Sequence, residues 1–194
     1  MADEPRKSWQ FVRARFQPCR LVGIGGWSGF SRCGMAVPSR HGNHPGTYFI
    51  TSRTWESRAL FLKEPACRIW VETVMHYRDG GAFQLHAFVL MPDHFHALLT
   101  PSQRTTLERA VQYVKGGSAH RIRKELNFRL PVWQRGYSDH RIRDGRDYEL
   151  HLRYLERNPV TGRLAAVAAD YVWSSASGRF PLDDPASVFG IVRE

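Results

Sequence analysis

Two histidines at positions 94 and 96 flank a single phenylalanine in the segment Met-Pro-Asp-His-Phe-His-Ala-Leu-Leu-Thr. Alternate side chains of a β-strand point to the same face, so His94 and His96 would hold two imidazole rings side by side. Such a pair can bind one metal ion or one phosphate, because neutral imidazole is a good ligand for divalent transition ions. Two histidines without a ligand are the alternative, and the pair alone does not decide between them.

A possible nucleophile lies far downstream, at Tyr154. On a helix, Asn158 and His151 would share its face, while a separate apolar stripe would pack on a sheet: Tyr148, Leu152 and Leu155. A phenol has a pKa of about 10, so it attacks only when a metal or nearby cations activate it. Asn158 could add an oxygen ligand to the same ion. Tyr154 could also be an ordinary packing residue, but a histidine pair on a strand with a tyrosine on a helix suggests DNA strand cleavage.

Arginines and aromatic residues interleave between these two sites, in the run Trp-Gln-Arg-Gly-Tyr-Ser-Asp-His-Arg-Ile-Arg. Aromatic rings stack on bases, and the planar fork of arginine binds phosphate, so such a run is suited to gripping single strands and hairpins. A basic loop on a solvated surface is the alternative. We predict nucleic-acid contacts from Lys115, Trp133, Arg135, Tyr137, His140, Arg141 and Arg143.

The charge of the whole chain agrees with a polyanionic partner. The net charge is +10 and the sequence pI is about 10.1, and only four of the 28 basic residues are lysines. A field of this sign attracts nucleic acid, although arginine richness can also reflect a GC-rich genome. Three scattered cysteines give neither a zinc motif nor a disulfide framework, which favours a reducing compartment. No apolar run approaches the roughly 20 residues of a membrane span.

The order of the expected elements predicts an α+β fold, a ferredoxin-like antiparallel sheet with helices on one face. Residues 1–45 read as an irregular N-terminal extension, and Met35 is a possible alternative start. Residues 46–175 would form the domain and residues 176–194 a C-terminal tail. The expected strands are 47–53, 83–90, 94–100 and one around 137–143; the expected helices are one over 66–77, one following 105–108, and 147–157, which Pro159 would end.

Six segments follow one another in a recognisable order. They are Gly-Thr-Tyr-Phe-Ile-Thr-Ser-Arg, Val-Leu-Met-Pro-Asp-His-Phe-His-Ala-Leu-Leu-Thr-Pro, Tyr-Val-Lys-Gly-Gly, Val-Trp-Gln-Arg-Gly-Tyr-Ser-Asp-His-Arg-Ile-Arg-Asp, Tyr-Leu-Glu-Arg-Asn-Pro-Val and Tyr-Val-Trp-Ser-Ser. In this order they resemble the REP-associated tyrosine transposases, single-tyrosine members of the HUH endonuclease superfamily. The resemblance implies that His94 and His96 are the histidine pair of that family, that Tyr154 is its nucleophile, and that Asn158 completes the metal site.

The same resemblance implies an enzyme that acts on single-stranded DNA folded into a hairpin of the repetitive extragenic palindromic (REP) type. With a divalent ion, Mg²⁺ or Mn²⁺, on the histidine pair, Tyr154 would attack the scissile phosphate and leave a 5′-phosphotyrosine and a free 3′-hydroxyl. The reaction would be reversible, so the same site could rejoin strands. We further expect a monomer or homodimer in the bacterial cytoplasm, associated with the nucleoid and without a membrane partner.

Three rival functions remain open at this stage. The first is a non-catalytic, domesticated DNA- or RNA-binding protein on the same scaffold. The second is a histidine-triad nucleotide hydrolase, but that chemistry needs a further histidine at position 98, where Leu98 stands. The third is a structural RNA-binding module, which would have no use for Tyr154.

Overall fold

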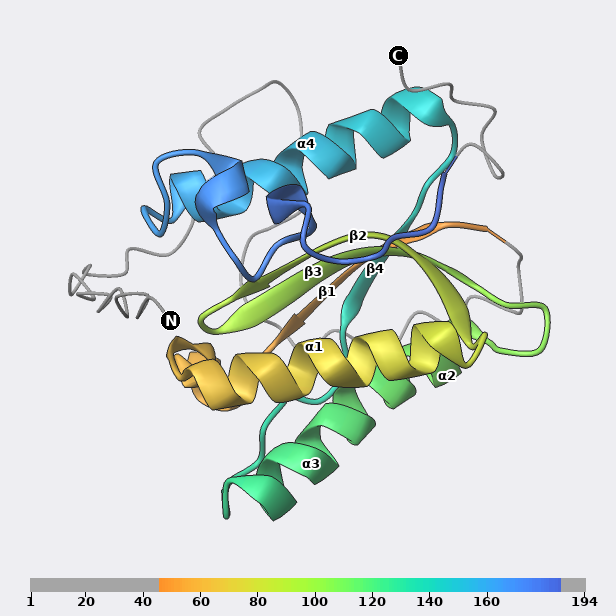
Figure 1. Cartoon of the computed structure of the whole chain (residues 1–194). Helices are drawn as coiled ribbons and strands as arrows, with labels where there is room; N and C mark the ends of the chain where they lie inside the picture. Colours follow the sequence, from red (N-terminus) through yellow and green to blue (C-terminus); the bar gives the residue numbers. More distant parts are fainter. Residues whose placement is uncertain (1–45, 186–194) are drawn as a thin grey trace, which may run out of the picture.

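The described part of the chain, residues 46–185 of this computed structural model, forms a four-stranded antiparallel sheet with helices on both faces (Figure 1). The strands β1 (Tyr48–Arg53), β2 (Phe83–Met91), β3 (His94–Pro101) and β4 (Ser138–Arg141) lie in the order β2-β3-β1-β4. The α+β class and the antiparallel sheet are confirmed, and the element order up to β4 is the ferredoxin-like one. The helices are α1 (Glu64–Asp79), α2 (Leu107–Gln112), α3 (Ser118–Glu125) and α4 (Gly145–Thr161). The expected N-terminal extension lies outside the described residues.

The hairpin of β2 and β3 places the histidine pair at the start of β3. Met91 pairs with His94, so only Pro92 and Asp93 form the turn. On the other side of β3, β1 brings Thr51 opposite His96 and Arg53 opposite His94. The turn and the strand register therefore decide which side chains surround the two imidazoles.

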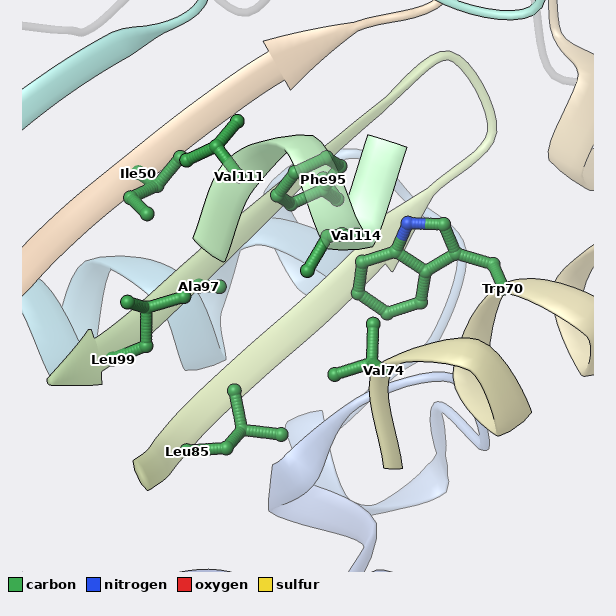
Figure 2. Close-up of a pocket in the computed structure, with 9 residues that line it drawn as sticks. All are labelled: Ile50, Trp70, Val74, Leu85, Phe95, Ala97, Leu99, Val111 and Val114. Carbon is green, nitrogen blue, oxygen red and sulfur yellow. The ribbon is translucent and has the colours of Figure 1, made fainter. Parts of the chain in front are cut away.

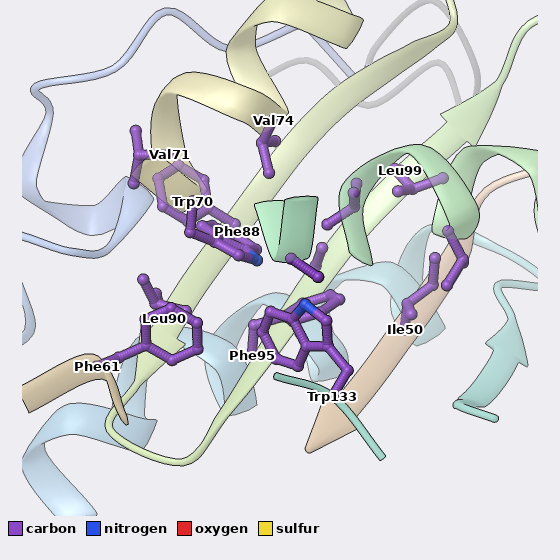
Figure 3. Close-up of a cluster of buried hydrophobic side chains, with 14 of the residues drawn as sticks. Ile50, Phe61, Trp70, Val71, Val74, Phe88, Leu90, Phe95, Leu99 and Trp133 are labelled. Atoms are coloured by element: carbon purple, nitrogen blue, oxygen red, sulfur yellow. The ribbon is translucent and has the colours of Figure 1, made fainter. Parts of the chain in front are cut away.

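Helices α1 to α3 cover one face of the sheet and enclose the larger core (Figure 3). Trp70 of α1 is fully buried, and its ring lies 5.6 Å from the ring of Phe88 and 5.1 Å from that of Phe95. Phe95 belongs to the alternate face of β3 that the sequence assigns to the core. The aromatic residues thus hold α1 against the middle of the sheet.

A π-helical segment, Tyr113–Gly117, joins α2 to α3. Gly116 and Gly117 lie in this segment, and the helix widens there instead of breaking. Gly117 lies so close to α1 that an added Cβ would stand 2.9 Å from side-chain carbons of both Thr73 and Tyr77. A glycine is required because any side chain at this position would push α1 and the π-helical segment apart.

Helix α4 lies on the opposite face of the sheet (Figure 1), so the expectation that all helices share one face holds for α1 to α3 only. The reason is that the strands are apolar on both sides. Phe49, Val89 and Leu98 point to the second face and are buried there beneath α4. The apolar stripe predicted for this helix packs on them as expected: Tyr148, Leu152 and Leu155.

The end of α4 corrects a second prediction. Pro159 was expected to end the helix, but it lies inside the last turn and the helix continues to Thr161. A proline near a helix end removes only one backbone hydrogen bond. The turn is closed by Gly162, whose N–H donates to the carbonyl oxygen of Asn158 over 2.8 Å.

The segment after residue 175, expected as a tail, packs on the domain as far as it is described. Asp183 accepts two hydrogen bonds from Arg78 of α1, at 2.9 and 2.8 Å, and a third from the backbone N–H of Leu85. Phe180 adds a ring contact of 5.1 Å to Phe88. This segment therefore closes the edge of the sheet along β2.

The void in the core beneath the sheet is too small to hold a substrate. The void beneath the sheet measures about 10 Å³ and is lined only by apolar side chains (Figure 2). This volume is at the lower limit for one water molecule, and the void has no polar partner for it. It is a small packing defect of the core. Among the described residues, no helix is long and apolar enough to cross a membrane.

Candidate active site at the β3–α4 interface

The two histidines of β3 lie side by side beneath α4. Their ring centroids are 4.9 Å apart and the ring planes are nearly perpendicular. Both side chains are buried, His96 more deeply than His94. The same-face placement follows from the two-residue period of the strand, and the cover over it comes from α4.

A neighbour fixes the protonated nitrogen of His94. Its Nδ1 lies 2.6 Å from the Asp93 carboxylate. Burial acts to raise the pKa of Asp93, but the hydrogen bond and charge of His94, with the charge of Arg53, hold that pKa below its usual value. An ionised carboxylate only accepts, so Nδ1 carries a proton, and Nε2 is the nitrogen that can present a lone pair to an ion.

His96 has a similar arrangement with a neutral partner. Its Nδ1 lies 2.7 Å from the hydroxyl of Thr51 on β1, whereas its Nε2 is buried and has no hydrogen-bond partner. Burial holds the pKa of His96 well below its usual value, and the charges of His94, Arg53 and His151 act in the same direction. A neutral imidazole with an unsatisfied buried nitrogen is a costly arrangement without a ligand.

These two side chains fit a divalent metal ion. Metal-ligating histidines commonly donate their second ring N–H to a carboxylate or another polar group, which fixes the tautomer. Asp93 contacts Nδ1 of His94 and Thr51 contacts Nδ1 of His96 in this way. The two Nε2 atoms remain as the nitrogens that could ligate a metal ion. The chemistry of the donor set is therefore that of a metal site with two imidazole ligands.

The phenol of Tyr154 reaches the same place from α4. Its ring lies 5.3 Å from the ring of His96 and 5.9 Å from that of Phe49, in edge-on contacts. Tyr154 was expected to point away from the apolar stripe of α4. Instead its half-buried side chain lies at the margin of that stripe, beside the histidines. A residue of α4 and two residues of β3, far apart in the sequence, are thus brought into one site.

Asn158 lies one turn further along α4 and is 3% exposed. Its Nδ2 donates a hydrogen bond of 2.9 Å to the carbonyl oxygen of Tyr154. The amide nitrogen is therefore engaged with the helix backbone, which leaves Oδ1 as the side-chain atom suited to bind an ion. The structure places this amide on the same helix as Tyr154 and holds its orientation.

The basic segment divides into exposed and buried members. Arg135, Arg141 and Arg143 have exposed side chains, as phosphate contacts require. Tyr137 is half-buried against the core under the sheet. His140 is also half-buried and binds the carboxylate of Asp147 at the start of α4, with 2.9 Å between Nε2 and Oδ2.

Trp133 requires a correction. We expected a platform for bases, but its side chain is 8% exposed and packs in the core beside Phe61 and Phe95 (Figure 3). Its indole N–H donates to the hydroxyl of Ser118, so the polar end of the ring is satisfied inside the protein. The interleaved pattern of aromatic and basic residues did not reveal that this ring points inward.

Lys115 also differs from the expectation of direct DNA contact. Its ammonium group donates hydrogen bonds to the backbone carbonyls of Gln134, over 2.9 Å, and of Gly136. Burial lowers its pKa to about 8. Lys115, which belongs to the π-helical segment, therefore holds the loop that contains Arg135. Any influence of Lys115 on DNA binding would act through this loop.

Four residues of this site were not selected from the sequence. Asp93 and Thr51 orient the histidines, Arg53 lies 3.4 Å from Asp93, and Phe49 contacts the rings of His96, His151 and Tyr154. The position of Asp93 directly before His94 was a visible signal. Thr51, Arg53 and Phe49 had none, because only the pairing of β1 with β3 brings them near.

Comparison with known proteins agrees with this geometry. The model of a family described as "Transposase IS200 like" matches residues 49–158, a range that contains both histidines, Tyr154 and Asn158. This match covers more than half of the chain and shows that the chain belongs to a class of transposase enzymes.

Individual relatives indicate which kind of transposase the chain resembles. A Haemophilus influenzae protein, named as a REP-associated tyrosine transposase, is 30% identical over 143 residues, covering 67% of this chain and 79% of its own. The Escherichia coli K12 REP-associated tyrosine transposase is 25% identical over 144 residues, covering 71% and 84%. A solved structure of a REP-associated tyrosine transposase bound to a REP hairpin shares the fold, with a TM-score of 0.58 at 23% identity, over 72% of this chain and 84% of the other. The chain belongs to the IS200-like transposase family, among the REP-associated tyrosine transposases.

Proposed function

We propose that this enzyme binds single-stranded DNA in a REP-type hairpin, and cleaves and rejoins it with Tyr154 as the nucleophile. The observation that carries the proposal is the 5.3 Å ring contact between Tyr154 of α4 and His96 of β3. Residues from two separate elements meet there, and together they provide a phenol and two imidazole donors. The hairpin in the solved structure of a relative supports the choice of DNA.

In this proposal His94 and His96, with Asn158, hold a divalent ion, Mg²⁺ or Mn²⁺. When bound, the ion supplies a Lewis acid for an oxygen of the scissile phosphate. In the neutral tautomer that suits this role, Nδ1 of His94 donates to Asp93 and Nδ1 of His96 donates to the Thr51 hydroxyl, so each Nε2 can bind the ion. The cover of α4 excludes water, which strengthens electrostatic interactions at the site.

Tyr154 carries out the covalent step. Its Oη forms a bond to phosphorus as the bond from phosphorus to the 3′ oxygen breaks. The phenol loses one proton and the departing 3′ oxygen gains one, so the products are a 5′-phosphotyrosine and a 3′-hydroxyl. One phosphodiester replaces another, and a 3′-hydroxyl can reverse the step and join strands.

The exposed arginines hold the DNA backbone beside this tyrosine. Arg141 and Arg143 lie just before the start of α4, and Arg135 lies on the loop that Lys115 anchors. Arginine binds phosphate through its fork of donors. We expect these contacts to position the strand and not to read its sequence.

The test is the capture of a covalent complex. A hairpin oligonucleotide from the DNA around the gene is labelled at its 3′ end, because the fragment that stays on Tyr154 lies 3′ to the break. Incubation with Mn²⁺ should give a labelled band at the mass of the protein plus DNA. Tyr154→Phe should abolish this band and leave hairpin binding nearly unchanged, since the ring and its packing remain.

Tyr148→Phe is the matched control, because Tyr148 lies on the same helix but is fully buried in the apolar stripe. It should still form the adduct. An adduct that persists in Tyr154→Phe would show that another residue is the nucleophile. Hairpin binding by the wild-type protein with no adduct in any divalent ion would favour the non-catalytic DNA-binding alternative.

A further inference from the structure

A second group of metal-binding side chains lies where β4 meets the first turns of α4. It consists of His140 of β4 with Asp147 and His151 of α4, and each offers one donor atom within 4.8 Å of the others. This cluster is separate from the β3 pair. The ring of Phe49 contacts both, at 4.8 Å from the ring of His151 and 5.2 Å from that of His96.

The cluster is preorganised around one buried carboxylate. Asp147 is 5% exposed, with Oδ2 lying 2.9 Å from His140 Nε2 and Oδ1 lying 3.2 Å from His151 Nδ1. The two imidazole rings stack with centroids 4.6 Å apart and planes at 17°. Two protonated rings would repel each other in this arrangement, so the geometry favours at least one neutral imidazole, the form that binds metals.

The carboxylate also has the outer support that metal ligands commonly show. The backbone N–H and Nε of Arg143 donate to Oδ2 of Asp147, over 3.1 and 3.3 Å. Hydrogen bonds of this kind hold a ligating carboxylate in place. Asp144 accepts from the backbone N–H of Asp147 over 2.9 Å, so the first turn of α4 is fixed by its cap as well.

We propose that His140, Asp147 and His151 form a second divalent-cation site, which takes a transition ion such as Zn²⁺ and ties β4 to α4. Two imidazole nitrogens and one carboxylate oxygen match the ligand preference of Zn²⁺, and water completes the coordination. In this structure His140 Nε2 donates to the Asp147 carboxylate and His151 Nδ1 donates to the Asp147 carbonyl oxygen over 2.9 Å, so an ion would displace both protons and each neutral ring would carry its proton on the other nitrogen.

The position of the site gives it a structural consequence. His151 lies on α4 one turn before Tyr154, and β4 pairs with β1 in the middle of the sheet. An ion held between the two elements would restrict movement of the tyrosine-bearing helix relative to the sheet. The site itself contains no nucleophile and is a positioning site.

The experiment counts ions in a chain that lacks the β3 pair. The His94→Ala, His96→Ala double variant is stripped of metal and titrated with Co²⁺, followed by calorimetry and by the visible absorption of the bound ion. One Co²⁺ per chain is expected. Adding His151→Gln should remove that ion, whereas adding His120→Gln, an exposed histidine of α3, should leave it bound.

Two results would overturn the proposal: no Co²⁺ bound by the double variant, or an ion that His151→Gln does not remove. The cluster would then be a hydrogen-bonded clamp around Asp147. A measurement on the wild-type protein covers the case in which the variants fail to fold. Zn²⁺ should shift the ring nitrogen signals of His140 and His151 in histidine-selective NMR, and shifts confined to His94 and His96 would equally overturn it. These readouts follow ion binding and not DNA cleavage, so the inference and the proposed function fail separately.

Discussion

The hydrogen bond between Thr51 and His96 allows a sharp test of how the β3 pair binds metal. Thr51→Val removes the hydroxyl that lies 2.7 Å from His96 Nδ1 and keeps a side chain of similar shape. His96 is 4% exposed, so water has little access to replace the lost partner. The imidazole then loses the contact that fixes its tautomer and ring orientation.

The expected size of the effect follows from this loss. Removing the outer partner of a metal-ligating histidine typically costs about 10–100-fold in metal affinity, which corresponds to roughly 1.4–2.7 kcal/mol. The free energy of unfolding should fall by about 1–3 kcal/mol, because the buried N–H of His96 would be left without a hydrogen-bond partner.

The assay is cleavage of the labelled hairpin over a range of Mn²⁺ concentrations. In Thr51→Val the half-saturating Mn²⁺ concentration should rise about 10–100-fold, while cleavage at saturating Mn²⁺ stays close to that of the wild type. Ser52→Ala is the matched control, because the neighbouring Ser52 hydroxyl is buried without a hydrogen-bond partner. An unchanged Mn²⁺ dependence in Thr51→Val would refute the assignment of Nε2 as the metal-binding atom of an oriented His96.

Three further predictions concern binding and stability. Replacing Arg135, Arg141 and Arg143 together by alanine should weaken binding to hairpin and scrambled strands alike, and lower the salt slope by roughly 0.7 per lost phosphate contact; a loss confined to the hairpin would instead indicate base reading. Trp133→Ala should lower the free energy of unfolding by about 3–5 kcal/mol in a denaturant titration, because the ring is in the core; a change under 1 kcal/mol would contradict this placement. The pKa of Asp183 is lowered: burial raises it, but the hydrogen bonds from Arg78 and from the backbone of Leu85, with the charges of Arg78 and His86, together outweigh burial. Its ionised form therefore stabilises the fold above pH about 4, so Asp183→Ala should be less stable than the wild type at pH 7. That difference should shrink as pH falls through the folded pKa, and a difference that persists at pH 2 would point to lost packing.

The order of elements was readable from local patterns. The alternation of Phe95, Ala97 and Leu99 against His94 and His96 predicted two distinct faces of β3, and the structure confirms that the Phe95 face packs in the larger core. A local pattern is sufficient for β3 because the two-residue period of a strand and the residues that form a turn are set within a few positions of the sequence. The apolar stripe of α4 was predicted for the same reason.

The face that α4 covers was not readable in this way. Its stripe shows that the helix packs on a sheet, but either face would satisfy it. The choice depends on β1, β2 and β3 together, since Phe49, Val89 and Leu98 need cover on the side that α1 to α3 leave open. Trp133 was misjudged for a related reason, because the sequence gives the type of a side chain in a loop and not its direction.

The sequence alone determined the candidate chemistry of this protein: two imidazoles on one strand face, a tyrosine on a helix, and a strongly basic field around them. These properties belong to residue types, strand and helix periods, and composition. The tertiary structure alone decided that Tyr154 meets His96, that Thr51 lies against the ring of His96, and that His140, Asp147 and His151 converge at the start of α4. Such contacts join residues of different elements, and only the pairing of β1 with its neighbours and the packing of α4 on the sheet bring those elements together.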